Sequence, residues 1–123
     1  MTIIHTLRRE DGFSVWANGH AEYAKAGDDD IVCAGISALL FSVLSYLECL
    51  SEKTGIGDLK YGWHEGDLIY HTEGFGGQDF FALDLLETGL KMLAERYPAH
   101  VKVNTHTDGI SLDDLLQEED AHG

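Results

Sequence analysis

Cysteine is scarce in this sequence, where only Cys33 and Cys49 occur. At about 100° per residue, the two side chains would lie on nearly opposite sides of one helix, so they cannot form a disulfide there. The chain also lacks an N-terminal apolar signal segment and an uninterrupted run of roughly 18 apolar residues. These absences exclude a disulfide scaffold and predict a cytoplasmic protein without a membrane span, in which Cys49 is structural.

Basic residues are also few, because 8 Lys and Arg stand against 22 Asp and Glu, for a formal net charge of -14. Binding to phosphates needs clustered Lys and Arg, so we expect no direct contact with nucleic acid. An acidic surface raises the encounter rate with basic proteins, but acidic residues equally serve solubility. The sequence leaves both interpretations of its charge open.

Motifs for metals and phosphates are absent as well. The seven histidines show no paired ligand spacing, so we expect no metal and no cofactor. Gly74, Gly76 and Gly77 lack the lysine and the spacing of a phosphate-binding loop, and we interpret them as a flexible junction. Trp16 and Phe75 are interpreted either as core residues or as a wall that contacts a bound peptide.

The sequence does contain enough apolar residues for one core, since 44% of its 123 residues are hydrophobic. A chain of this length buries a core without help from disulfides. No internal repeat or long linker divides it. We therefore expect a single domain over residues 1–110, followed by an acidic C-terminal tail over residues 111–123.

Hydrophobic periodicity predicts the element order β-β-α-β-β-α-β. Apolar and polar residues alternate on both sides of Asp11-Gly12 and again around Gly66, and both patterns are typical of hairpins. Apolar spacings of three and four predict two helices, of which the second ends at Pro98. The expected strands cover residues 2–8, 13–18, 59–63, 68–70 and 101–105, and the expected helices cover 31–53 and 78–96. This predicts an α+β fold with one mixed, mostly antiparallel sheet packed with two helices.

The most informative segment runs from Gly19 to Leu39, because it contains both a histidine and a cysteine. His20 follows a predicted strand, and Cys33 lies at the start of a predicted helix. Residues 21–29 show no apolar periodicity, so we expect a loop that can bring the two side chains together. A thiol next to an imidazole is a nucleophile with its base.

The helix start gives arguments for and against a reactive Cys33. Asp30 is a good N-cap, which would place Cys33 among the first three helical residues, where free N–H groups favour a thiolate. The carboxylates of Asp28, Asp29 and Asp30 oppose a second negative charge. A free cysteine in a helix is also often a small buried apolar residue. Spacing alone therefore leaves the catalytic and the structural interpretation of Cys33 open.

Family resemblance favours the catalytic interpretation. Gly-His-Ala at 19–21, Gly27 and Asp-Ile-Val-Cys-Ala-Gly-Ile-Ser-Ala-Leu at 30–39 resemble the signature of the ribosomal-processing cysteine protease (Prp) family. The resemblance implies a small cytoplasmic bacterial endopeptidase that removes an N-terminal extension from a large-subunit ribosomal protein. It also implies that His20 is the general base and Cys33 is the nucleophile.

Two further groups are expected to assist the chemistry. The backbone N–H groups of Cys33 and Ala34 are candidates for the oxyanion hole, because they would lie at the start of the helix. Asp30 either orients His20 or caps the helix, and one carboxylate does not easily do both.

Four positions are expected to contact the substrate: Gly19, Gly27, Ala34 and Ser37. The two glycines bracket the loop and would let it close over a peptide. Ser37 follows Cys33 by one helical turn, so it either lines the site or bonds to a carbonyl of its own helix.

A non-catalytic function is the main alternative. A ribosome-associated module would bind a basic protein through its acidic surface, and it would need neither the thiol of Cys33 nor the imidazole of His20. A redox-sensing thiol would need a resolving cysteine nearby, and Cys49 faces away from Cys33.

The first predicted helix also predicts a homodimer. Its apolar side chains, from near Ile31 onward, cover more than one stripe, so part of them would stay exposed in a monomer. Twofold pairing through this helix or through one hairpin would bury that patch, and the family resemblance also implies a dimer. The alternative is that the acidic C-terminal segment covers the patch within one chain.

Overall fold

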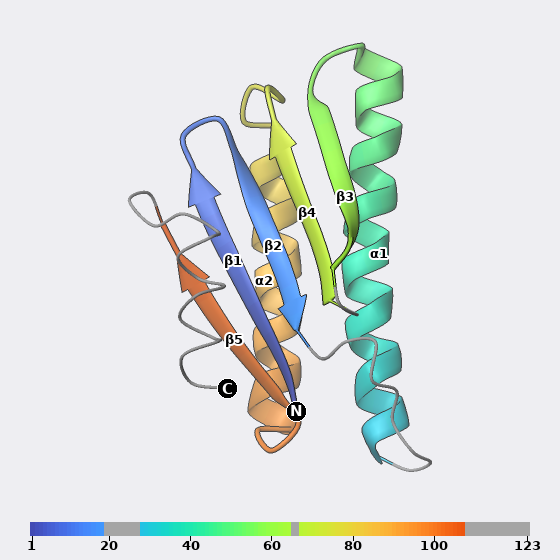
Figure 1. Cartoon of the computed structure of the whole chain (residues 1–123), viewed down its shortest axis with the longest axis vertical. Coiled ribbons are helices and arrows are strands. Elements are labelled where there is room, and N and C mark those ends of the chain that lie inside the picture. The colour runs from blue at the N-terminus through green and yellow to red at the C-terminus, as the bar shows by residue number, and fades with distance from the viewer. Residues whose placement is uncertain (19–27, 65–66, 108–123) are drawn as a thin grey trace.

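A computed structural model describes residues 1–18, 28–64 and 67–107 of the chain. Five strands and two helices follow one another there in the predicted order (Figure 1). They are β1 (Thr2–Arg9), β2 (Gly12–Asn18), α1 (Asp28–Thr54), β3 (Asp58–His64), β4 (Asp67–Glu73), α2 (Asp79–Arg96) and β5 (Val101–His106). The predicted α+β fold class is confirmed.

All five strands belong to one mixed sheet with the order β3-β4-β2-β1-β5. β1 and β2 form one antiparallel hairpin and β3 and β4 another, and β2 joins the two by pairing antiparallel with β4. β5 lies parallel to β1, from Thr2 opposite Val101 to Leu7 opposite His106. Among the described strands this is the one parallel pair, so the sheet is mostly antiparallel, as predicted.

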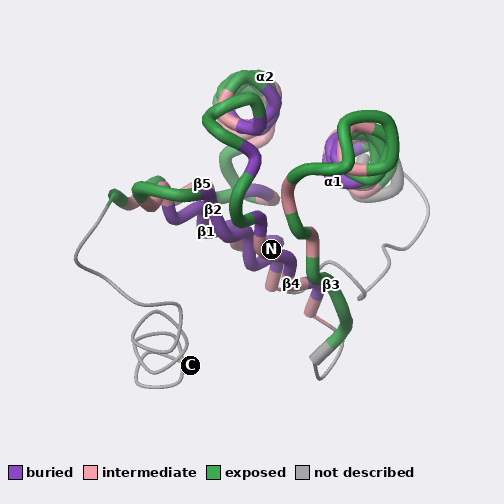
Figure 2. Tube along the Cα trace, turned by 90° about the horizontal axis from the view of Figure 1, so that it is seen from above, coloured by how far each residue is buried: buried purple, intermediate pink, exposed green. Residues whose placement is uncertain are grey.

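Both helices cover the same face of the sheet (Figure 2). Phe13, Val15 and Ala17 alternate along β2 and reach the core between the sheet and the helices. The buried core consists of Ile4, Phe13, Val15, Ala17, Val32, Ile36, Leu40, Val43, Leu44, Leu47, Leu68, Tyr70, Phe75, Ala82, Leu83, Leu86, Leu90 and Val101. Phe75 is fully buried in it, so this residue is part of the core and not of a peptide-binding wall.

Two glycines let the helices approach each other closely. A Cβ atom at Gly89 of α2 would lie 2.8 Å from Cδ2 of Leu39 on α1, and one at Gly35 of α1 would lie 3.3 Å from Cδ1 of Leu93 on α2. Glycine in a helix interior costs about 1 kcal/mol relative to alanine. Each glycine leaves room for a leucine of the other helix, and this close packing offsets the cost of the glycine.

Hydrogen bonds connect the start of α2 to the sheet. The hydroxyl of Thr72 donates to Oδ2 of the buried Asp79 at 2.5 Å, and the N–H of Phe13 donates to Oγ1 of Thr72 at 2.9 Å. The three groups thus join α2, β4 and β2 in one chain of bonds, which is stronger in a buried environment than in water.

By length and composition alone, residues Ile31–Thr54 of α1 are also apolar enough to cross a membrane. One such helix is weak evidence for a membrane span, because the core helix of a soluble protein passes the same test. The apolar character of α1 has a direct use here, since Val32, Ile36, Leu40 and Leu47 pack into the core.

Two glycine substitutions test the packing of the sheet. A Cβ atom at Gly12 would collide with the backbone carbonyl of Thr72, whereas one at Gly62 would meet nothing within 4 Å. We expect Gly12→Ala to lower the free energy of unfolding by roughly 1–3 kcal/mol. Gly62→Ala should leave it unchanged or raise it by about 0.5–1 kcal/mol. Urea unfolding of both variants checks this, and equal stabilities would contradict the packing described for Gly12.

Candidate active site

α1 begins earlier than the sequence predicted, at Asp28 instead of Ile31. Asp30 therefore lies in the first helical turn and not at the N-cap, and the predicted loop 21–29 ends before Asp28. Only the N–H groups of the N-cap and of the first three helical residues lack a partner within a helix, and among the described residues these are the N–H groups of residues 28–30. This corrects the idea that the N–H groups of Cys33 and Ala34 are free because they open the helix.

Cys33 lies in the second turn of α1 with a free, half-buried thiol. Ala34 is exposed, and Ser37, one turn further along the same side of the helix, is half-buried. The exposure of Cys33 disagrees with the interpretation that it is a buried core residue. Cys49, predicted to be structural, is exposed on the surface of α1.

β2 ends next to the start of β4, at the end of the molecule where α1 begins (Figure 1). The indole N–H of Trp16 and the amide of Asn18 both donate to Oδ2 of Asp67, at 3.0 and 3.2 Å. These bonds fix the last residues of β2 against β4. His20, the predicted base, follows Asn18 by two positions in the sequence and lies outside the described residues.

Several predicted site residues lie outside the described part of the chain: Gly19, His20, Gly27 and the loop residues between His20 and Asp28. The structure therefore brings together Cys33, Ala34 and Ser37 on α1. The pairing of Cys33 with His20 stays a prediction.

An aromatic group near this part of α1 was not anticipated. Phe41 follows Cys33 and Ser37 at helical spacing, and its ring centroid lies 6.3 Å from that of Trp63 on β3, with the planes tilted by 42°. Next along β3, the carboxylate of Glu48 on α1 interacts with the hydroxyl of Tyr61 and raises its pKa. The i, i+4 spacing was visible in the sequence, but the pairing of α1 with β3 was not.

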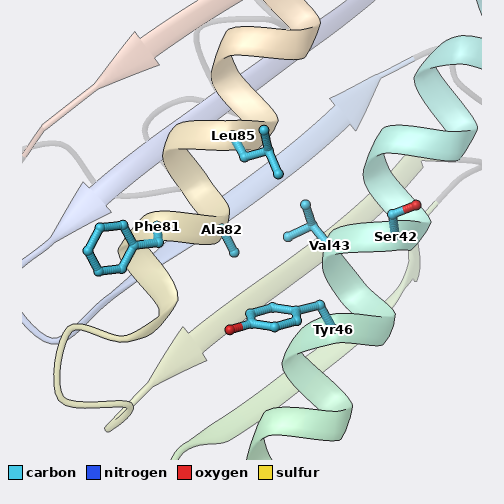
Figure 3. A pocket seen from close by; sticks show the side chains of 6 residues that line it. All are labelled: Ser42, Val43, Tyr46, Phe81, Ala82 and Leu85. Atoms are coloured by element: carbon cyan, nitrogen blue, oxygen red, sulfur yellow. The ribbon is translucent and has the colours of Figure 1, made fainter.

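An apolar pocket of about 350 Å³ lies elsewhere, between α1 and α2. Figure 3 shows the side chains that line it: Ser42, Val43, Tyr46, Phe81, Ala82 and Leu85. At about 100° per residue, Ser42 points to the side of α1 opposite Cys33. The pocket is therefore separate from the candidate active site.

Histidines gather on the sheet face that points away from the helices. His5 stacks on Trp16 and on His106, with ring centroids 5.1 and 5.4 Å apart. Ser14 and Nδ1 of His71 are hydrogen-bonded at 2.8 Å. Burial lowers the pKa of His71, and the charges of Arg9 and Lys60 lower it further.

This face is structural in the part of the chain that the structure describes. Trp16 is almost fully buried there, with Leu7 and Ile69 around it, so it is not a peptide-binding wall. No group of three His, Cys, Asp or Glu side chains in residues 1–18, 28–64 and 67–107 could hold a metal ion.

Comparisons with known proteins identify the family of the chain. A family model described as cysteine protease Prp matches residues 1–102 of the chain. The search of curated protein sequences found no match to this chain.

Solved structures share the fold. SMU.848 from Streptococcus mutans is 24% identical, covers 88% of this chain and 96% of its own, and has a TM-score of 0.63. The ribosomal processing protease Prp from S. aureus, in complex with a substrate peptide, is 20% identical over 85% of this chain and 99% of its own, with a TM-score of 0.66. The same protein with a covalently linked product peptide is 21% identical over the same shares, with a TM-score of 0.65.

Proposed function

Because the chain belongs to the cysteine protease Prp family, we propose that it is a ribosomal-processing endopeptidase that removes an N-terminal extension from a large-subunit ribosomal protein in the cytoplasm. The observation that carries this proposal is the free, half-exposed thiol of Cys33, within the residues that match the family. The similar S. aureus structures, described as a ribosomal processing protease with a substrate or product peptide, support the substrate class.

The mechanism uses Cys33 as nucleophile and His20 as base. The imidazole of His20 takes the thiol proton, and Sγ of Cys33 attacks the scissile carbonyl carbon. The tetrahedral intermediate collapses to a thioester when the imidazolium gives its proton to the leaving amine. Water, activated by the same imidazole, then hydrolyses the thioester and releases the free thiol.

The remaining site residues orient the base and bind the peptide. Asp30, in the first turn of α1, is proposed to orient His20. Gly19 and Gly27 are proposed to let the intervening loop close over the peptide. Ala34 and Ser37 lie exposed and half-buried beside Cys33, and we assign them to peptide contact.

The charge of the chain fits this substrate. With a formal net charge of -14, the enzyme attracts basic proteins. The range of this attraction decreases as the salt concentration rises. A ribosomal protein is such a partner. The same charge makes direct contact with nucleic acid unfavourable.

We also propose that the protein is a homodimer. No charged residue occurs in α1 from Ile31 to Leu47, although several side chains of this stretch face outward, Ile31 and Tyr46 among them. Beside the pocket of Figure 3, Phe81 and Leu85 are 81% and 69% exposed. An uncharged helix face next to exposed apolar side chains is typical of a surface that pairs with a second copy.

Replacing the nucleophile tests the proposed reaction. We expect Cys33→Ala and Cys33→Ser to abolish cleavage of the N-terminally extended ribosomal protein while the fold is kept, because alanine has no nucleophile and a hydroxyl, with its much higher pKa, is a poor substitute for a thiol that is activated by imidazole alone. Cleavage is followed by mass spectrometry, with Cys49→Ala as the control that should keep full activity. Appreciable turnover by either Cys33 variant would refute the assignment of Cys33 as the nucleophile, whereas a wild type that does not cleave the extended protein would favour the non-catalytic module.

Replacing the base separates chemistry from binding. His20→Ala should slow turnover by at least roughly 10²-fold while the extension peptide still binds, since a base acts in the chemical step. Calorimetric titration measures the binding of the extension peptide, and single-turnover kinetics measure the chemical step. If binding disappears together with turnover, His20 is a scaffold residue.

Light scattering tests the dimer. At micromolar concentration the mass should be close to twice the 13.6 kDa of one chain. Ala38→Glu places a charge on the exposed, uncharged face of α1 and should shift the mass toward one chain. A wild-type mass of one chain at every accessible concentration would contradict the dimer.

A further inference from the structure

A line of partly exposed side chains leads from Cys33 along α1. Cys33, Ser37 and Phe41 follow one another at intervals of four residues, so they lie on one side of the helix. Cys33 and Ser37 are half-buried, and Phe41 is 38% exposed. At about 1.5 Å per residue, Phe41 lies about 12 Å from Cys33 along the helix axis.

β3 borders this line. Trp63 packs against Phe41 with a centroid distance of 6.3 Å, and Tyr61 interacts with Glu48, which lies about two turns beyond Phe41 on α1. Tyr61 and Trp63 alternate along the strand with Gly62, so their side chains lie on the same face. Because β3 is at the edge of the sheet, the aromatic group Phe41–Trp63–Tyr61 is open toward solvent beside α1.

These rings lie outside the buried core. Trp63 is 54% exposed and Tyr61 is 56% exposed, and neither belongs to the core cluster or to the apolar side chains packed against it. Single exposed apolar residues are ordinary, but three adjacent rings with a polar rim are typical of a binding surface. Their distance from the nucleophile suggests what they bind.

We propose that Phe41, Trp63 and Tyr61 form a subsite for an apolar side chain of the peptide substrate. This inference rests on the proposed function, because it takes Cys33 as the point where the peptide is cut. An extended peptide advances about 3.3 Å per residue, so a span of about 12 Å places the occupant at the third or fourth residue from the scissile bond. Glu48, at the far end of the line, favours a basic residue beyond it.

A peptide library randomised at each position tests the subsite without assuming the natural substrate. The wild type should prefer aromatic or aliphatic residues at the third or fourth position on one side of the cut. Trp63→Ala should reduce this preference roughly tenfold, mainly through KM, since the contact is made in the ground state as well as in the transition state. Trp63→Phe should retain most of it.

Ile56→Ala is the matched control, because Ile56 is an exposed apolar side chain in the connection after α1, at the other end of that helix from Cys33 (Figure 1). It should leave the preference unchanged. Thermal melts of the variants verify that each is folded. An absent preference, or one that Trp63→Ala and Phe41→Ala leave intact, would overturn the subsite.

The same experiment separates the two proposals. If library peptides are cut with the expected preference but the extended ribosomal protein is not, the subsite is supported and the ribosomal substrate is refuted. If the ribosomal protein is cut with the same kcat/KM by Trp63→Ala and the wild type, the subsite is refuted and the proposed function is supported.

Discussion

The packing of α1 against the sheet determines the geometry of the candidate active site. Val32 and Ile36 are buried in the core, on either side of Cys33 in the sequence. Their burial fixes the rotation of the helix about its axis. Cys33 is thereby held at the boundary between core and solvent, half-buried, where a thiol is both fixed by its neighbours and accessible to a peptide. A modest rotation of α1 would bury the thiol or expose it fully.

Local patterns in the sequence were sufficient for most of the fold. The Asp11-Gly12 turn with its alternating flanks, the spacing of leucines in α2 and the stop at Pro98 depend on neighbours in the chain, and these elements were predicted correctly. The start of α1 was missed by three residues. Acidic residues are favourable both at the N-cap and within the first turn of a helix, so the run Asp28-Asp29-Asp30 does not mark the boundary, and all three lie inside the helix.

The candidate site was predictable only in part, for a similar reason. Cys33 was assigned a catalytic role from its motif, and this role stays a prediction; the structure adds that its thiol is free and half-buried. The aromatic group beside it combines α1 with β3, which pack together only in the folded chain. The sequence shows that Trp63 belongs to a strand in which apolar and polar residues alternate, but no local rule says that its partner is Phe41. The correction to the oxyanion hole likewise follows from where the helix begins, a boundary that propensity resolves poorly.

The parallel pairing of β5 with β1 has a consequence for how the protein is made. Thr2 lies opposite Val101, so β1 leaves the ribosome long before its partner β5 and keeps one edge open until nearly the whole described chain has followed. β2 can close the other edge much earlier through its hairpin. Contacts this distant in sequence form slowly because the loop between them must be closed first. During synthesis, the uncovered edge of β1 is therefore the surface most in need of protection from other nascent strands.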